Sequence, residues 1–167
     1  IQSLSPARPT IVAVGGFSGS GKSTVARALA PMLDPAPGAV ALRSDVIRKE
    51  IMGVGDRVRL GSDGYTPHVS ARVYATLADR AKVVVRSGFS AIGDATFTMA
   101  EGRTALARIA EAAGVQFAGF WLETDRDTMA ARIAARADDP SDADAAILDR
   151  QLADGVENLD WIRLDAR

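Results

Sequence analysis

A glycine-rich turn near the start of the chain has the residue types needed to bind phosphate. It matches the pattern G-x-x-x-x-G-K-[ST] at every position, with Gly16, Phe17, Ser18, Gly19, Ser20, Gly21, Lys22 and Ser23. Glycines let successive N–H groups point at one anion, and a following helix adds its positive end. We expect Lys22 at the β- and γ-phosphates of a nucleoside triphosphate and the Ser23 hydroxyl on Mg²⁺. The neighbouring Thr24 could reach an α-phosphate.

An acidic residue in the next part of the chain could direct the terminal phosphate to an acceptor. Asp45 follows an apolar segment, and Arg48 lies one helical turn later on the same side. A carboxylate there can accept the proton of a hydroxyl that attacks the γ-phosphate. Arg48 could bind an anionic group of the acceptor or the phosphate in transfer. Alternatively, Asp45 only caps the helix that begins there.

A second acidic residue, Asp94, ends another apolar segment. This position resembles the Walker B site, where a carboxylate holds Mg²⁺ directly or through water. Asp94 could instead line the acceptor pocket or form a turn.

Arg132 and Arg136 are spaced i, i+4, which predicts one helix face. They suggest a lid over about residues 126–145 whose arginines neutralise charge on the phosphates. Alternatively, both are solvated.

Short apolar segments alternate with amphipathic ones and supply the scaffold for these residues. Strands are expected at residues 11–14, 39–43, 89–94 and 115–122, with a weak fifth at 161–164. Helices are expected at residues 21–32, 45–52, 66–87, 99–113, 125–137 and 141–153. Four of these helices carry predicted N-terminal caps, namely Thr66, Thr98, Asp125 and Ser141. Because the strands are apolar on both faces, we predict an α/β fold, with a parallel sheet covered on both sides.

Composition limits the other possibilities. The chain has 167 residues, which fits one domain, and it lacks cysteine, so disulfides and thiolate metal sites are excluded. No apolar run is long enough to cross a membrane. The net charge of −1 argues against a broad nucleic-acid surface. Residues 1–9 are polar, hold two prolines and lack a signal-peptide core, so they are interpreted as a linker or tail before a domain at 10–167. A cytoplasmic location is expected.

In this order the motifs resemble those of P-loop kinases, in the branch of the polynucleotide and gluconate kinases. The matching strings are Ser44-Asp45-Val46-Ile47-Arg48, Asp94-Ala95-Thr96, and Arg132 with Arg136. The resemblance implies a three-layer fold with a five-stranded parallel sheet in order 2-3-1-4-5. It also implies that Asp45 is the general base, that Arg48 contacts a phosphate of the acceptor, and that Arg132 stabilises the transferred phosphoryl group.

A second resemblance covers most of the chain. The strings RSDVIRK, YTPHVSARVY, GDATF and SDADAAILDRQL are similar to the ATP-binding half of certain bacterial fusion proteins. Those proteins join an aminoglycoside-phosphotransferase-like domain to a P-loop kinase-like domain and are described as predicted kinases or AAA-family ATP-binding proteins. This resemblance implies that an upstream domain precedes the linker-like start.

Together these features predict an ATP- and Mg²⁺-dependent phosphotransferase acting on a hydroxyl. The GTPase motif N-K-x-D is absent, which favours ATP as the donor. The charge favours a small-molecule acceptor over a nucleic-acid 5′-hydroxyl. The alternative from another class is an ATP-binding module that regulates an attached domain and transfers nothing.

Overall fold

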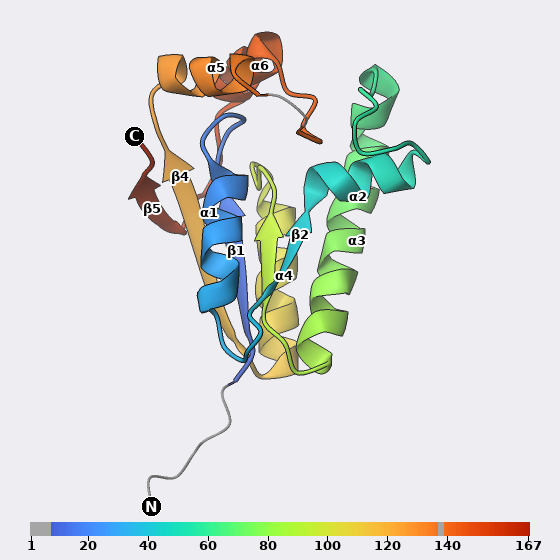
Figure 1. Ribbon diagram of the computed structural model, residues 1–167, viewed down its shortest axis with the longest axis vertical. Coiled ribbons are helices and arrows are strands. Elements are labelled where there is room, and N and C mark those ends of the chain that lie inside the picture. Colours follow the sequence, from blue (N-terminus) through green and yellow to red (C-terminus); the bar gives the residue numbers. More distant parts are fainter. Residues whose placement is uncertain (1–7, 137–138) are drawn as a thin grey trace, which may run out of the picture.

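A parallel sheet forms the centre of the molecule in the computed structural model, which describes residues 8–136 and 139–167. Its strand order, β2-β3-β1-β4-β5, confirms the expected one. Every strand pair is parallel. The strands are β1 Thr10–Gly15, β2 Val40–Arg43, β3 Ala91–Asp94, β4 Gln116–Glu123 and β5 Ile162–Asp165. Helices lie on both sides of the sheet, so the fold is the three-layer α/β/α arrangement (Figure 1).

Six α-helices and two short 3₁₀ helices occupy the described part of the chain. They are α1 Lys22–Leu29, η1 Ala30–Met32, α2 Ser44–Ile51, η2 Ser62–Tyr65, α3 Pro67–Arg86, α4 Ala100–Ala113, α5 Arg126–Ala134 and α6 Ala145–Asp154. The first helix was expected to run to Met32, but its last turn is η1. Pro31 accounts for this difference, because proline lacks the N–H that an α-helical turn needs.

Strand β1 is buried on both faces, as its apolar sequence predicts. Ile11 and Ala13 belong to the core on the side of α3 and α4, while Val12 and Val14 pack with Ala26 of α1 on the other. Successive side chains of a strand point to opposite faces, so this one strand joins both cores. The end of β1 is therefore rigidly placed where the glycine-rich turn begins.

Two of the predicted helix caps are confirmed. The Thr66 side chain accepts a hydrogen bond from the backbone N–H of Val69, and Pro67 takes the first helical position of α3. The Asp125 carboxylate accepts from the backbone N–H of Thr128 at the start of α5. Each cap satisfies a backbone donor that the first helical turn leaves without a partner.

The capping boxes predicted at Thr98 and Ser141 are wrong. The N-cap of α4 is Met99, without a side-chain bond, after the chain turns through Phe97 at a φ of 50°. The N-cap of α6 is Asp144, whose carboxylate accepts from the N–H of Ile147. Asp139 pairs with Arg43 and Asp142 with Lys49, and residues 139–142 form no helix, so α6 begins later than the pattern suggests.

Candidate active site

The glycine-rich turn, residues 16–23, joins β1 to α1 and is called the P-loop below. Gly16 and Gly19 have φ values of 141° and 82°, in the region that favours glycine. A Cβ on Gly19 would lie 2.4 Å from the carbonyl oxygen of Met129, so α5 packs directly on the loop. The backbone N–H of Gly16 donates to the Thr96 carbonyl at 3.2 Å, which ties the loop to the segment that follows β3.

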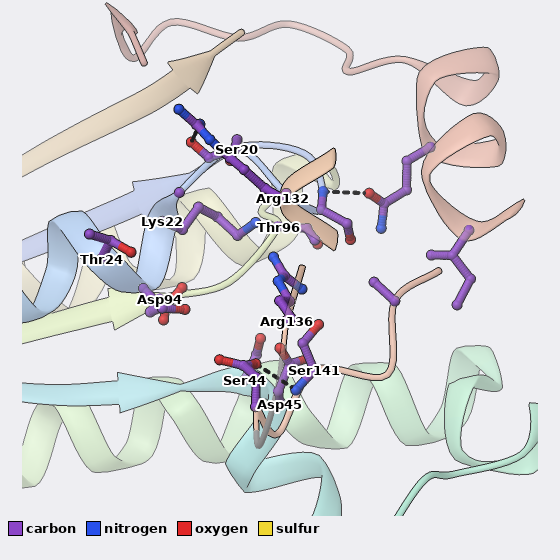
Figure 2. A pocket seen from close by; sticks show the side chains of 18 of the residues that line it. Ser20, Lys22, Thr24, Ser44, Asp45, Asp94, Thr96, Arg132, Arg136 and Ser141 are labelled. Atoms are coloured by element: carbon purple, nitrogen blue, oxygen red, sulfur yellow. Dashed lines mark hydrogen bonds between the residues drawn. The ribbon is translucent and has the colours of Figure 1, made fainter. Parts of the chain in front are cut away.

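One pocket of about 700 Å³ collects nearly all of the predicted site residues. Figure 2 shows Lys22, Asp45, Asp94, Arg132 and Arg136 around it. Ser18 to Thr24 and Arg48 also line it, whereas Gly16 and Phe17 lie outside its lining. The carboxyl ends of β1, β2 and β3 meet here, where ligands bind in open parallel sheets.

Lys22 extends along the P-loop. Its Nζ donates to the Phe17 carbonyl oxygen at 2.9 Å. Burial lowers the pKa of Lys22, and the carboxylates of Asp94 and Asp45 partly offset this effect. A bound anion at this position would therefore stabilise the charged form of Lys22 and raise its pKa again.

Asp45 lies in the first turn of α2 and is half-buried at the pocket. The N-cap of this helix is Arg43, so the alternative that Asp45 only caps the helix is wrong. Within the described ranges the Asp45 carboxylate has no hydrogen-bond donor. Burial raises the pKa of Asp45, and Asp94 acts in the same direction, while Lys22 opposes both. A carboxylate with these properties is suited to accept a proton.

Arg48 is 8% exposed and is already engaged by the protein. Its NH1 donates to the Gly64 carbonyl oxygen at 2.7 Å and to Ser70 Oγ at 3.3 Å. The guanidinium lies 4.6 Å from the centre of the Tyr65 ring. Arg48 therefore joins α2 to η2 and α3 at one side of the pocket, and only part of its guanidinium remains for a ligand.

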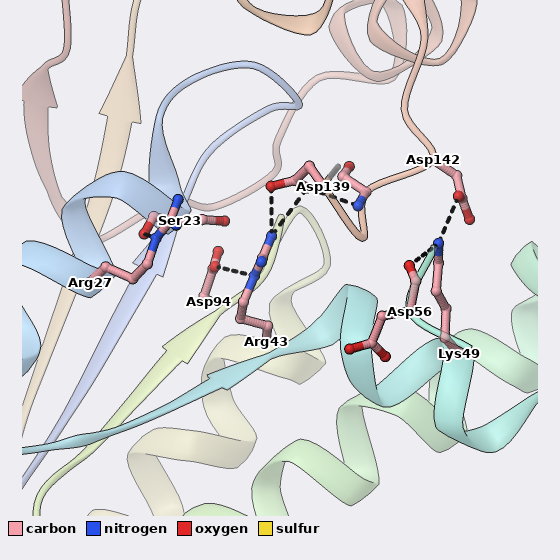
Figure 3. A network of polar contacts seen from close by, with 9 residues as sticks. Ser23, Arg27, Arg43, Lys49, Asp56, Asp94, Asp139 and Asp142 are labelled. Atoms are coloured by element: carbon pink, nitrogen blue, oxygen red, sulfur yellow. Dashed lines mark hydrogen bonds and ion pairs between the residues drawn. The ribbon is translucent and has the colours of Figure 1, made fainter. Parts of the chain in front are cut away.

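Asp94 is 4% exposed and has an unexpected neighbour, Arg43 at the end of β2. The Arg43 Nε lies 3.4 Å from Asp94 Oδ2, and its NH2 lies 3.2 Å from Asp139 Oδ1 (Figure 3). Asp94 Oδ2 is buried and accepts no hydrogen bond from the described residues. Sequence reasoning missed Arg43, although a charged residue at the carboxyl end of an apolar strand segment is a usable signal.

The pocket fits Mg²⁺ better than a metal held by protein ligands alone. Within residues 8–136 and 139–167 no group of three His, Cys, Asp or Glu side chains could hold an ion. Asp94 and Ser23 offer a carboxylate and a hydroxyl oxygen at the same pocket. Mg²⁺ is commonly held by one or two protein oxygens together with phosphate oxygens and water.

Both predicted lid arginines line the pocket, but from different backbone positions. Arg132 belongs to α5; its NH1 lies 3.4 Å from the Ser20 carbonyl oxygen and its NH2 donates to the Ala166 carbonyl oxygen at 2.8 Å. The shared helix face was wrong, because α5 ends at Ala134 and Arg136 follows it. The Arg136 N–H bonds to the Ile133 carbonyl, three residues back, which closes the helix. The predicted helix end at residue 137 lies outside the described residues.

A buried ion pair joins α2 to the segment before α6. Lys49 Nζ lies 3.1 Å from Asp142 Oδ1, and the side chains are 2% and 5% exposed (Figure 3). Asp142 Oδ2 accepts from the Tyr65 hydroxyl at 2.8 Å and from the Leu60 N–H at 3.2 Å. Lys49 also donates to the Asp56 carbonyl at 2.8 Å. These contacts hold the glycine-rich loop 53–64 against residues 139–144.

Gln151 of α6 is a second residue that sequence reasoning missed. Its Oε1 accepts the backbone N–H of Ser18 at 2.8 Å, and the residue lines the pocket. The two residues are 133 positions apart, and a glutamine in an amphipathic helix carries no distinctive signal.

The parallel sheet in order 2-3-1-4-5, with a P-loop between β1 and α1, is the fold of the P-loop kinases. Residues 11–155 match a family model described as an AAA domain (AAA_33), and the chain belongs to that family. Uncharacterised proteins of Mycobacterium tuberculosis and Mycobacterium bovis are 33% identical over 164 residues, which is 96% of this chain. The chain spans only 32% of the length of those relatives.

Solved kinases share the fold. A gluconokinase from Sinorhizobium meliloti 1021 is 23% identical, with a TM-score of 0.59 over 96% of this chain and 84% of its own. A putative kinase from Chloroflexus aurantiacus is 19% identical, with a TM-score of 0.67 over 95% and 86%. The APS kinase of Mycobacterium tuberculosis in complex with AMPPNP and APS is 26% identical, with a TM-score of 0.58 over 74% and 68%. These likenesses show that the chain shares the fold of these kinases.

Proposed function

We propose that the chain transfers the γ-phosphate of ATP, with Mg²⁺, to a hydroxyl of a small-molecule acceptor. The observation that carries this proposal is Asp45: a carboxylate with a raised pKa and no described hydrogen-bond donor, in one pocket with Lys22 and Asp94. A site that only binds nucleotide has no need of a proton acceptor beside the phosphate loop. The APS kinase that shares the fold was solved with AMPPNP, which favours an adenine nucleotide here.

Each residue has one part in the transfer. The P-loop amides and Lys22 hold the triphosphate, with Thr24 beside the α-phosphate. Asp45 accepts the proton of the acceptor hydroxyl as its oxygen bonds to the γ-phosphorus. The bond between that phosphorus and the β–γ bridging oxygen breaks, and ADP leaves with the electron pair. Ser23 and Asp94 would hold Mg²⁺, which would supply positive charge at the phosphate oxygens.

The arginines supply further charge around the phosphates. Arg132 and Arg136 line the pocket, and we assign both to the transferring phosphoryl group. Arg48 keeps only part of its guanidinium for a ligand, so we assign it to the acceptor through that part. Residues 126–145, with α5 and the segment that follows it, form the proposed lid.

The walls of the acceptor side favour a small compound rich in hydroxyls. Hydroxyl side chains predominate there, from Ser44, Tyr65, Ser70, Tyr74, Thr96, Thr98 and Ser141. Arg48 lines this side, and the protein already engages its guanidinium. A polynucleotide 5′-hydroxyl is the second candidate, because part of one chain in the Pnkp1/Rnl/Hen1 complex also has this fold, with 18% identity and a TM-score of 0.58 over 82% of this chain and 42% of that one.

The setting of the domain also belongs to the proposal. No described helix combines the length and apolar character of a membrane span. We propose a cytoplasmic protein in which residues 1–9 link this domain to an upstream one. The much greater length of the mycobacterial relatives supports such a fusion.

Labelled ATP with panels of hydroxyl acceptors, including polyols, sugars and 5′-hydroxyl oligonucleotides, tests the proposal. Asp45→Asn is expected to lower transfer by about two to four orders of magnitude while ATP affinity is kept. Asp154→Asn, at an exposed position on α6, is the matched control. A regulatory module would instead bind ATP equally in all three proteins and label no acceptor, and that result would refute the kinase.

A further inference from the structure

Gln151 places a side-chain amide from α6 directly on the P-loop. Its Oε1 accepts the Ser18 N–H at 2.8 Å, so the last helix of the domain contacts a main-chain group of the loop. Gln151 is half-buried and lines the same pocket as Lys22. The assigned steps of the transfer do not use this residue.

The contact with Ser18 fixes which way the amide faces. A backbone N–H can only donate, so the side-chain atom opposite it must be the carbonyl oxygen. The NH₂ group of Gln151 is then the other end of the same planar amide. It donates to none of the described residues, and it belongs to a side chain that lines the pocket. Gln151 thus has two N–H donors that remain available to a ligand bound in this part of the pocket.

The position of Lys22 indicates which phosphate of a bound nucleotide would lie nearest to Gln151. The Lys22 Nζ donates to the carbonyl oxygen of Phe17, and Phe17 immediately precedes Ser18 in the chain. A P-loop lysine reaches the β- and γ-phosphates, while the amides nearer the helix hold the α- and β-phosphates. The Phe17–Ser18 peptide therefore marks the γ end of the loop. Gln151 is bonded to that same peptide.

We propose that Gln151 recognises the γ-phosphate, so that α6 distinguishes ATP from ADP. Its oxygen stays on the Ser18 N–H, which orients the amide, and its Nε2 donates to a γ-phosphate oxygen. A hydrogen bond to a charged oxygen is stronger than a neutral one, so its loss has a measurable effect. The inference rests on ATP as the donor of the proposed function.

Nucleotide binding without any acceptor tests this inference. ATP and ADP affinities, with Mg²⁺, are compared by calorimetry in the wild type, Gln151→Glu and Gln151→Leu. Glutamate keeps an oxygen for Ser18 but replaces the donor with negative charge. We expect ATP affinity to fall about 10- to 100-fold in Gln151→Glu and about 10-fold in Gln151→Leu. ADP affinity should change less than about threefold, because ADP lacks the group that Gln151 contacts.

Gln116→Glu is the matched control, because Gln116 is exposed at the start of β4, the strand end away from the pocket. It should leave both affinities unchanged, and circular dichroism confirms that each variant is folded. An equal loss for ATP and ADP would overturn the inference, since Gln151 would then only brace the loop. Tighter ATP binding in Gln151→Leu would also overturn it, since the oxygen would be competing with phosphate. If selectivity follows Gln151 but no acceptor is ever labelled, the transfer proposal fails and this inference stands.

Discussion

The buried pair of Lys49 and Asp142 allows a quantitative prediction about stability. Asp142→Asn keeps the shape of the side chain and an oxygen for Tyr65 and Leu60, but it removes the charge opposite Lys49. The Lys49 side chain is 2% exposed, so its ammonium would be left without a counter-charge. Leaving one member of a buried pair alone costs about 3–5 kcal/mol. Lys49 keeps the Asp56 carbonyl, so we expect the lower end, about 3 kcal/mol.

A loss of this size is large against the total stability of a domain, which is about 5–15 kcal/mol. For a chain of this length it corresponds to a melting temperature lower by about 6–12 °C. Urea unfolding followed by circular dichroism measures the free energy, and equal m values show that the unfolded states are comparable. Asp154→Asn on the exposed end of α6 controls for the substitution itself.

The double variant Lys49→Met/Asp142→Asn separates charge from packing. It removes the buried cation, so it should be more stable than Asp142→Asn alone. The reasoning is refuted if the free energy of unfolding of Asp142→Asn lies within about 1 kcal/mol of the wild-type value, because a loss that small is typical of a solvent-exposed ion pair. It is equally refuted if the double variant is less stable than the single one.

Three further predictions concern the pocket. Because burial raises the pKa of Asp45, the folded state binds its proton more tightly than the unfolded chain, and ionisation at neutral pH opposes folding. Asp45→Asn should therefore raise the free energy of unfolding at pH 7, and the gain should vanish in urea titrations at a pH below the ordinary pKa of aspartate. Gly19→Ala should destabilise the fold by more than about 2 kcal/mol, because its Cβ meets Met129, whereas Gly53→Ala, with a φ of 71° and open space, should lose only about 1–2 kcal/mol. Equal losses in the two variants would contradict that reading of the loop. Asp94→Asn should abolish the increase in ATP affinity that Mg²⁺ gives the wild type in calorimetry, and an unchanged increase would assign the ion to other groups.

The P-loop could be predicted from the sequence because its residues are contiguous and its conformation depends on neighbouring residues. Gly16 to Ser23 needs only a strand before it and a helix after it, and both are visible as apolar patterns. Asp45 and Asp94 were found for a similar reason, since each lies at the carboxyl end of a strand and these ends must face the same edge of the sheet. The strand order came from a resemblance to known kinases rather than from the pattern itself.

The contacts that complete the site could not be predicted in the same way. Arg43 meets Asp139 across 96 positions, and Ser18 meets Gln151 across 133. Nothing in the local sequence specifies such pairs, because they depend on how α5 and α6 return to the loop. The wrong caps had the opposite cause: Thr98 and Ser141 fit the local pattern, but tertiary contacts moved the helix starts.

Most cations of this pocket are held by main-chain oxygens rather than by acids. Lys22 donates to the Phe17 carbonyl, Arg48 to that of Gly64, and Arg132 to that of Ala166. A carbonyl survives every side-chain substitution and does not titrate. The residue types at the three partner positions, Phe17, Gly64 and Ala166, can therefore change while the carbonyl oxygen that binds each cation remains. An alanine scan of partner residues would pass over these contacts, whereas replacing single amides by esters would reveal them.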